Sequence, residues 1–138
     1  MRRLLFLCLA IVATLGVGCN KEKTESHDQY YVLWITARVV DSDGNPIQGI
    51  YVYPEGYAFA GREGYTNYLG EMGGTVHIEP NSVQRIVFED IDGEYNGGVY
   101  ATKYVDIAHL LTPTTPADKN GYSGSSFIEL GDVVLTLK

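Results

Sequence analysis

Residues 39–52, with the sequence VVDSDGNPIQGIYV, constrain the fold more than any other stretch of this chain. Upstream of it, apolar residues occupy every second position from Leu33 to Val39, which is the period of a strand with one buried face. Residues 41–46 then collect Asp, Gly, Asn and Pro. These favour a turn because Asp and Asn side chains accept hydrogen bonds from nearby backbone N–H groups and proline removes a ladder donor. Alternation resumes from Ile50. The stretch therefore predicts two strands joined by an ordered turn.

The remainder of the chain after Cys19 also has the composition of a β protein. The chain has 16 glycines and 11 tyrosines, and no segment after Cys19 shows the 3.6-residue period of an amphipathic helix. We expect seven short strands, at residues 30–40, 49–53, 75–78, 83–89, 99–107, 126–130 and 133–137. Seven strands separated by turn signals predict an all-β fold, namely a single seven-stranded antiparallel β-sandwich of the immunoglobulin-like kind.

The alternating apolar positions also predict the core. We expect the following side chains to be buried: Leu33, Ile35, Val39, Ile50, Val52, Ile86, Phe88, Val133, Leu135 and Leu137. The single tryptophan, Trp34, lies in the first predicted strand, and we expect it in the core rather than on a ligand-binding surface. Lys138 directly follows the last predicted strand, so we expect the last residues to be held in a sheet.

The first nineteen residues predict a lipoprotein signal. Two arginines are followed by an apolar run at residues 4–15, which is shorter than the roughly 20 residues that a membrane-spanning helix needs. Small residues precede Cys19, as a lipoprotein signal peptidase requires, although the usual leucine three positions before the cysteine is a glycine here. We expect residues 1–18 to be removed and Cys19 to be acylated, which anchors the protein in a membrane. The alternative is an ordinary secretory signal followed by an unmodified cysteine.

Removal of this signal makes an acidic protein more acidic. The formal net charge of the chain is −7, and loss of the two arginines makes it −9. Binding of nucleic acid needs clustered Lys and Arg, so this class of partner is not expected. Residues 20–29, NKEKTESHDQ, contain no aliphatic or aromatic side chain. We therefore expect residues 19–29 to form a lipidated cysteine with a flexible tether, followed by one domain at residues 30–138.

Two motifs resemble a known domain family. The pattern V-x-D-x-D-G-x-P-I-x-G-I-x-V at residues 39–52 resembles the opening of carboxypeptidase-regulatory-like domains, which are transthyretin-like seven-stranded β-sandwiches. The second signature of that family, T-D-x-x-G-x-F, is matched by TNYLGEM at residues 66–72, with Asn67 in place of Asp and Met72 in place of Phe. A third stretch, FEDIDGEYNGG at residues 88–98, together with the lipoprotein signal, resembles the radical-SAM-associated lipoproteins.

The last resemblance implies a cellular setting rather than an activity, because that family is named for genes that lie beside radical-SAM enzymes. We expect an outer-membrane lipoprotein facing the periplasm or the cell surface of a Gram-negative envelope. Three functions follow as hypotheses. The first is a non-catalytic binding or accessory protein of the cell envelope, the second a substrate or partner of a radical-SAM maturation enzyme, and the third a glycan-binding module.

A tyrosine-rich segment at residues 51–68 is the main candidate for ligand binding. The candidate residues are Tyr51, Tyr53, Tyr57, Phe59, Tyr65 and Tyr68. Rigid aromatic rings offer contact area at low entropic cost, which suits a carbohydrate or peptide ligand. The alternative is that these tyrosines cover a half-exposed sheet face, with packed rings and solvated hydroxyls. The long connection at residues 107–124, which contains two prolines, is a second candidate binding surface.

Two loops rich in Asp and Asn, at residues 90–96 and 41–45, are candidate sites for a metal ion. Asp90, Asp92 and Asn96 supply oxygen atoms of the kind that Ca²⁺ prefers, and residues 41–45 do so again. Neither loop has the order of an EF-hand, and the alternative is that these side chains serve as turn residues. The three histidines are far apart in sequence, so a zinc site is not expected. No motif for a nucleophile or for phosphate binding is found, so we expect a protein that is not an enzyme.

Overall fold

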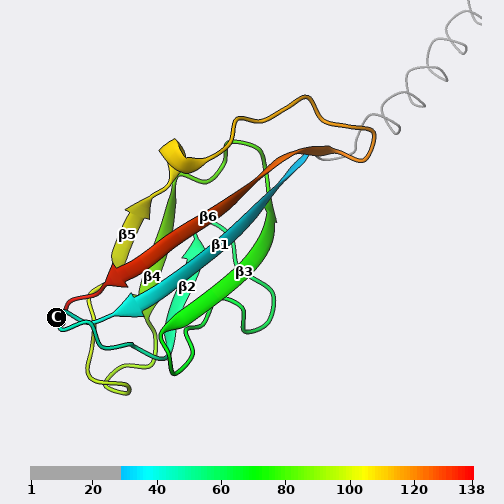
Figure 1. Cartoon of the computed structure of the whole chain (residues 1–138). Helices are drawn as coiled ribbons and strands as arrows, with labels where there is room; N and C mark the ends of the chain where they lie inside the picture. Colours follow the sequence, from blue (N-terminus) through cyan, green and yellow to red (C-terminus); the bar gives the residue numbers. More distant parts are fainter. Residues whose placement is uncertain (1–28) are drawn as a thin grey trace, which may run out of the picture.

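Two three-stranded sheets face one another in the computed structural model, which describes residues 29–138 (Figure 1). The strands are β1 (Tyr30–Val40), β2 (Ile50–Pro54), β3 (Glu71–Ile78), β4 (Arg85–Asp90), β5 (Lys103–Asp106) and β6 (Tyr122–Val134), with a 3₁₀ helix, η1 (Ala108–Leu110), between β5 and β6. The predicted signal sequence and the lipidation site Cys19 lie outside the described residues. Within residues 29–138, no helix has the length and apolar character needed to cross a membrane.

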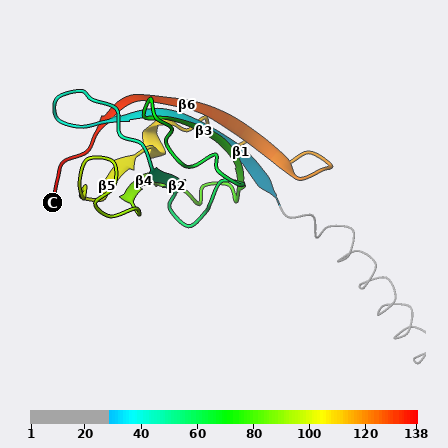
Figure 2. The same ribbon diagram turned by 90° about the horizontal axis from the view of Figure 1, so that it is seen from below.

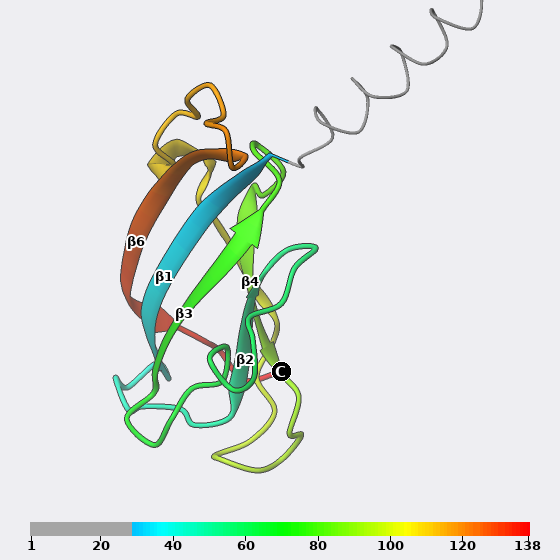
Figure 3. The same cartoon turned by 90° about the vertical axis from the view of Figure 1, so that its right-hand side faces the viewer.

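The order is β3-β1-β6 in one sheet and β2-β4-β5 in the other, and the two form separate layers (Figures 2 and 3). The core between the layers is one cluster of apolar side chains drawn from both sheets. Alternation places them there: in β1 every second residue from Tyr31 to Val39 is buried, and the residues between point to the outer face. The cluster confirms nine of the ten predicted core residues, namely Leu33, Ile35, Val39, Ile50, Val52, Ile86, Phe88, Val133 and Leu135.

The prediction was wrong for two apolar residues. Trp34 is 46% exposed, because Leu33 and Ile35 on either side of it point inward and a strand cannot bury both faces against one layer. Leu137 is 61% exposed, because β6 ends before it and only an isolated bridge to Tyr100 follows. The last residue is nevertheless held, since the N–H of Lys138 donates to the carbonyl oxygen of Val99 at 2.9 Å.

The all-β class is confirmed, but the described residues form six strands rather than seven, and they are not all antiparallel. The predicted strands at residues 126–130 and 133–137 are replaced by one long strand, β6, which runs parallel to β1. Its register against β1 shifts twice by one residue, and Gly124 (φ 126°) and Gly131 (φ 65°) lie in the two shifts. Glycine accepts this positive φ, so each extra residue forms a bulge and the strand continues.

A glycine pair likewise lies inside β3, which begins four residues before the predicted strand at residues 75–78. A Cβ on Gly74 would lie 2.7 Å from the ring of Phe59, so the glycine leaves the space that this ring occupies. Phe59 is only 6% exposed and belongs to the core cluster. One glycine of a pair that suggests a break in the strand therefore provides the space in which an aromatic ring packs.

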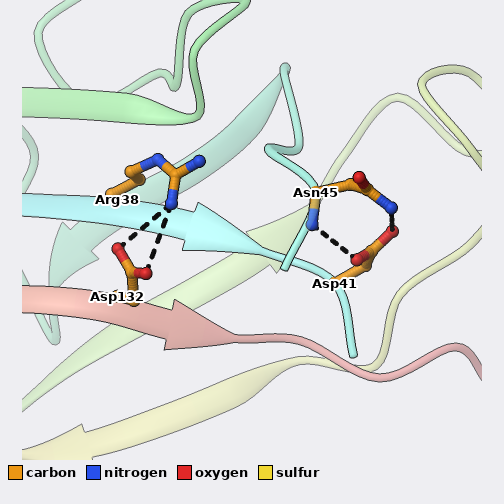
Figure 4. A network of polar contacts seen from close by, with 4 residues as sticks. All are labelled: Arg38, Asp41, Asn45 and Asp132. Carbon is orange, nitrogen blue, oxygen red and sulfur yellow. Dashed lines mark hydrogen bonds and ion pairs between the residues drawn. The ribbon is translucent and has the colours of Figure 1, made fainter. Parts of the chain in front are cut away.

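The turn after β1 is closed by the side chain of Asp41, as the sequence predicts. Its Oδ1 accepts hydrogen bonds from the backbone N–H groups of Asp43 (2.9 Å) and Asn45 (2.8 Å), and the amide of Asn45 donates to its Oδ2 at 3.3 Å (Figure 4). These bonds, that from the Asn45 backbone first, lower the pKa of Asp41 below its ordinary value. Nearby, the exposed pair Arg38–Asp132 joins β1 to β6 at 3.2 Å.

The second glycine-containing motif, at residues 66–72, connects the segments that lead into β2 and β3 through hydrogen bonds. Thr66 is 4% exposed, and its Oγ1 donates to the carbonyl oxygen of Ile47 at 2.7 Å and accepts from the N–H of Ile50 at 2.9 Å. Asn67 Oδ1 accepts from the N–H of Leu69 (2.9 Å) and of Glu71 (3.0 Å), which forms the turn into β3. The threonine thus holds the approach to β2 against the segment that leads to β3.

Candidate functional site

The outer face of the β2-β4-β5 sheet carries a row of three tyrosines, which we call the tyrosine stack although neighbouring rings are tilted by 31° and 34°. Because Ile50, Val52 and Pro54 point into the core, Tyr51 and Tyr53 point outward. The ring centroids of Tyr51 and Tyr53 are 4.8 Å apart, and those of Tyr51 and Tyr65 are 4.9 Å apart. Tyr51 is therefore enclosed between two neighbouring rings, whereas Tyr65 ends the stack and is 40% exposed.

The backbone of the loop before β3 places Tyr65 in this stack. An isolated antiparallel bridge joins Tyr65 to Tyr51, and the N–H of Val52 donates to the carbonyl oxygen of Gly64 at 2.7 Å. A Cβ on Gly64 would lie 2.6 Å from the carbonyl oxygen of Val52. Glycine at this position is what allows the loop to approach β2 closely enough for the two rings to meet.

The aromatic face continues across β4 to β5. Tyr53, Val87 and Tyr104 form one row across the sheet, and Val87 is only 2% exposed although it points outward, which indicates that its neighbours cover it. The guanidinium of Arg85 lies 4.3 Å from the ring centroid of Tyr104. The same arginine pairs with Glu55 at the end of β2.

On this face, the carboxylate of Glu89 raises the pKa of the Tyr53 hydroxyl. The hydroxyl of Tyr53 donates to Oε2 of Glu89 at 2.8 Å. This hydrogen bond, with smaller contributions from burial and from the charge of Glu89, raises the pKa of Tyr53 to about 12. The phenol therefore stays protonated and fixed at all physiological pH values.

A cleft of about 650 Å³ adjoins the free end of the tyrosine stack. Its lining residues are Gln48, Gly49, Gly61, Arg62, Tyr65, Thr66 and Asn96. It therefore combines one aromatic ring with amide groups and a guanidinium, which are donors and acceptors suited to a polar ligand. Gly49 lies in this wall with φ 81°, a backbone conformation that favours glycine, and a Cβ there would also displace the side chains of Asp92 and Asn96.

The three residues considered for Ca²⁺ do come together beside this cleft. Nδ2 of Asn96 donates to Oδ2 of Asp92 at 2.6 Å, and Asp90 accepts from the N–H groups of Asp92 (3.3 Å) and Tyr100 (2.9 Å). Burial first, and then the adjacent Asp90 carboxyl, raise the pKa of Asp92 above its ordinary value. Among residues 29–138, no group of three or more His, Cys, Asp or Glu side chains is arranged to hold a metal ion. The close contacts seen are those of a turn.

The structure separates the six aromatic candidates into two groups. Tyr51, Tyr53 and Tyr65 form the stack, and the other three lie elsewhere. Phe59 is buried in the core, and Tyr68 is 74% exposed on the turn before β3. The hydroxyl of Tyr57 accepts from the N–H of Glu79 at 3.0 Å and shares a hydrogen bond with Ser82.

Sequence reasoning missed the other half of the site. Tyr104 and Arg85 lie on the outer face of neighbouring strands. The alternation of residues within each strand is the sequence signal that could have identified them. Arg62 lies within the predicted binding segment at residues 51–68, whereas Gln48 lies outside it and reaches the cleft only through the path of its loop.

The connection at residues 107–124 is fixed rather than open. Ile107 is fully buried, and the hydroxyl of Tyr31 donates to the carbonyl oxygen of Thr112 at 2.7 Å. The N–H of Thr115 donates to the carbonyl oxygen of Ser123 at 2.8 Å, so the loop folds back along the start of β6. Comparison with known proteins adds no assignment: no family model, curated protein or solved structure matches this chain.

Proposed function

We propose that this protein is a lipid-anchored, non-catalytic binding protein of the cell envelope, held in the outer membrane through acyl chains on Cys19. The observation that carries the binding proposal is the polar cleft at the free end of the tyrosine stack. The anchor rests on the sequence of the first nineteen residues. The two sheets and the motifs at residues 39–52 and 66–72 support a relationship to the carboxypeptidase-regulatory-like, transthyretin-like domains.

A glycan is the ligand class that this cleft suits best. A sugar ring has an apolar face and a rim of hydroxyls, so it needs one aromatic surface surrounded by hydrogen-bonding groups. Tyr65 supplies the ring, and Gln48, Arg62 and Asn96 supply donors and acceptors. Tyr51 has a neighbouring ring on either side, so Tyr65 is the member of the stack available to a ligand.

The test is titration of the protein with a panel of envelope polysaccharides and their oligosaccharide fragments, followed by NMR or affinity electrophoresis. We expect Tyr65→Ala and Arg62→Ala each to weaken binding roughly tenfold, the effect of about 1.4 kcal/mol. Tyr68→Ala is the matched control, because Tyr68 is exposed but does not line the cleft. Absence of binding to every glycan, or binding unchanged by Tyr65→Ala and Arg62→Ala, would refute the glycan proposal. A covalent change in the natively expressed polypeptide would favour a substrate of a radical-SAM maturation enzyme instead.

A further inference from the structure

We infer that the tether end of the β3-β1-β6 sheet has a second role: its outer face rests on the surface of the membrane that anchors the protein. This inference rests on the proposed lipidation of Cys19. The face in question is the tether-end aromatic patch, which we define as Tyr30, Trp34, His77, Tyr122 and Phe127. It lies on the sheet opposite the tyrosine stack and is separate from the cleft.

The patch consists of two groups of ring contacts, which together involve all three strands. The ring of Tyr30 stacks on His77 of β3 at 4.8 Å and meets Tyr122 of β6 at 5.8 Å. Trp34 meets Phe127 edge-on at 6.0 Å. Trp34 and Phe127 remain 46% and 58% exposed, so two large apolar side chains face outward beside each other.

Charge is distributed unevenly along this sheet face. At the far end, Arg38 is flanked by Glu71 on β3 and Asp132 on β6. Glu129 pairs with Thr36 and lies two positions from Phe127 of the patch. The patch itself contains no Asp, Glu, Lys or Arg. The loop before β6 contributes one acid and one base, Asp118 and Lys119, and so adds no net charge. The five rings therefore form an aromatic surface at one end of an acidic protein, with two carboxylates at its border: Glu129, and Glu63, which accepts from the N–H of Thr75 at 3.4 Å.

The position of the anchor identifies what covers this surface. Cys19 lies eleven positions before Tyr30, so the acyl chains are at most about 40 Å of extended chain from the patch. The start of β1 and the loop before β6 lie at this end of the sandwich, and the last residue lies at the other (Figures 1 and 3). Residues 20–29 have no apolar side chain with which to cover the patch. Trp and Tyr favour the membrane–water interface, and tethering raises the effective concentration of the bilayer, so a weak contact is sufficient.

Because Trp34 is the single tryptophan of the chain, its fluorescence reports directly on whether the patch contacts the membrane. The lipidated protein is reconstituted in phosphatidylcholine–phosphatidylethanolamine vesicles, and the fluorescence of Trp34 is compared with and without bromine on the lipid acyl chains near the headgroup. We expect bromine to quench roughly half or more of the emission, because interfacial rings sit at headgroup level. Phe127→Glu places a carboxylate beside Trp34 outside the core, and we expect it to reduce this quenching at least about threefold.

A reporter on the opposite sheet is the control. In Trp34→Phe combined with Tyr104→Trp, the tryptophan occupies a position that is 53% exposed on β5, and bromine should not quench it. Flotation of the vesicles reports on the anchor separately. Protein that floats with unquenched Trp34 overturns this inference alone, whereas protein that does not float overturns the proposed anchor as well. A third outcome is that bromine does not quench Trp34, but the protection of Trp34 from aqueous iodide increases with the density of protein on the vesicles. This would show that a second copy of the protein covers the patch, and it would overturn the membrane contact.

Discussion

Replacing Thr66 by valine tests how the motif at residues 66–72 holds the fold together. Valine has nearly the same shape as threonine, so the substitution removes the hydroxyl and leaves the packing in place. That hydroxyl lies in a side chain only 4% exposed, where it donates to the carbonyl oxygen of Ile47 at 2.7 Å and accepts from the N–H of Ile50 at 2.9 Å. Both backbone groups therefore lose a buried partner at once.

The expected loss follows from these two bonds. An unsatisfied buried backbone group costs about 1–3 kcal/mol, and the added methyl group returns about 1 kcal/mol of burial. For two such groups, we expect the free energy of unfolding to fall by about 1–5 kcal/mol. For a domain of this size, that corresponds to a fall in Tm of roughly 4–20 °C.

Thermal and urea unfolding of the parent, Thr66→Val and Thr66→Ser would measure this effect. Serine keeps both hydrogen bonds and loses one methyl group, so Thr66→Ser should cost only about 1 kcal/mol. The reasoning would be refuted if Thr66→Val unfolded within about 1 kcal/mol of the parent. Equal destabilisation by the two variants would show that the methyl group, not the hydroxyl, is what matters.

Three further predictions follow from the described contacts. Glu89→Gln should lower the pKa of Tyr53 from about 12 toward its ordinary value of 10.0, and an unchanged NMR titration of the tyrosine would contradict the assignment. In the parent protein, the stability that comes from the raised pKa is complete below pH 10 and is lost as the pH rises through about 12. The pKa of Asp92 is raised by burial and by Asp90, so its protonated form contributes stability below pH 3.8 that is lost as the pH rises through the raised value. Asp92→Asn should therefore increase the Tm at pH 7 by about 2–4 °C, whereas a decrease, with sensitivity of the parent to EDTA, would indicate a bound cation. Gly74→Ala should lower stability by about 1–2 kcal/mol in urea unfolding, since its Cβ would lie 2.7 Å from an aromatic ring, and a neutral effect would show that the ring yields easily.

The strand pattern and most of the core could be predicted because they depend on local alternation. β1 has the predicted bounds, and β2 begins one residue after the predicted start. The burial of Trp34 was mispredicted because hydrophobicity was given more weight than position, although the alternation that buries Leu33 and Ile35 forces the residue between them outward. Sequence pattern was therefore more reliable than residue type.

Errors elsewhere arose from glycine and from long-range pairing. Gly131 suggested the end of a strand, but its positive φ forms a bulge within β6 instead. The parallel pairing of β6 with β1 joins residues about ninety positions apart, and no local pattern specifies it. The cleft was predicted in part: Arg62 and Tyr65 lie in the predicted binding segment at residues 51–68, whereas Gln48 is brought to them by the path of another loop. The tyrosine stack was partly predicted, since Tyr51 and Tyr53 share one face of a single strand.

The most direct test of the account is the intact mass of the protein purified from its native membrane. We predict the mass of residues 19–138 plus the acyl groups on Cys19 and nothing more, as expected for an anchored protein that binds ligands without being modified. An unprocessed chain, or a cleaved chain without lipid, would contradict the anchor. Further mass gained or lost on residues 30–138 would contradict the binding-protein account and identify the protein as a substrate of a maturation enzyme.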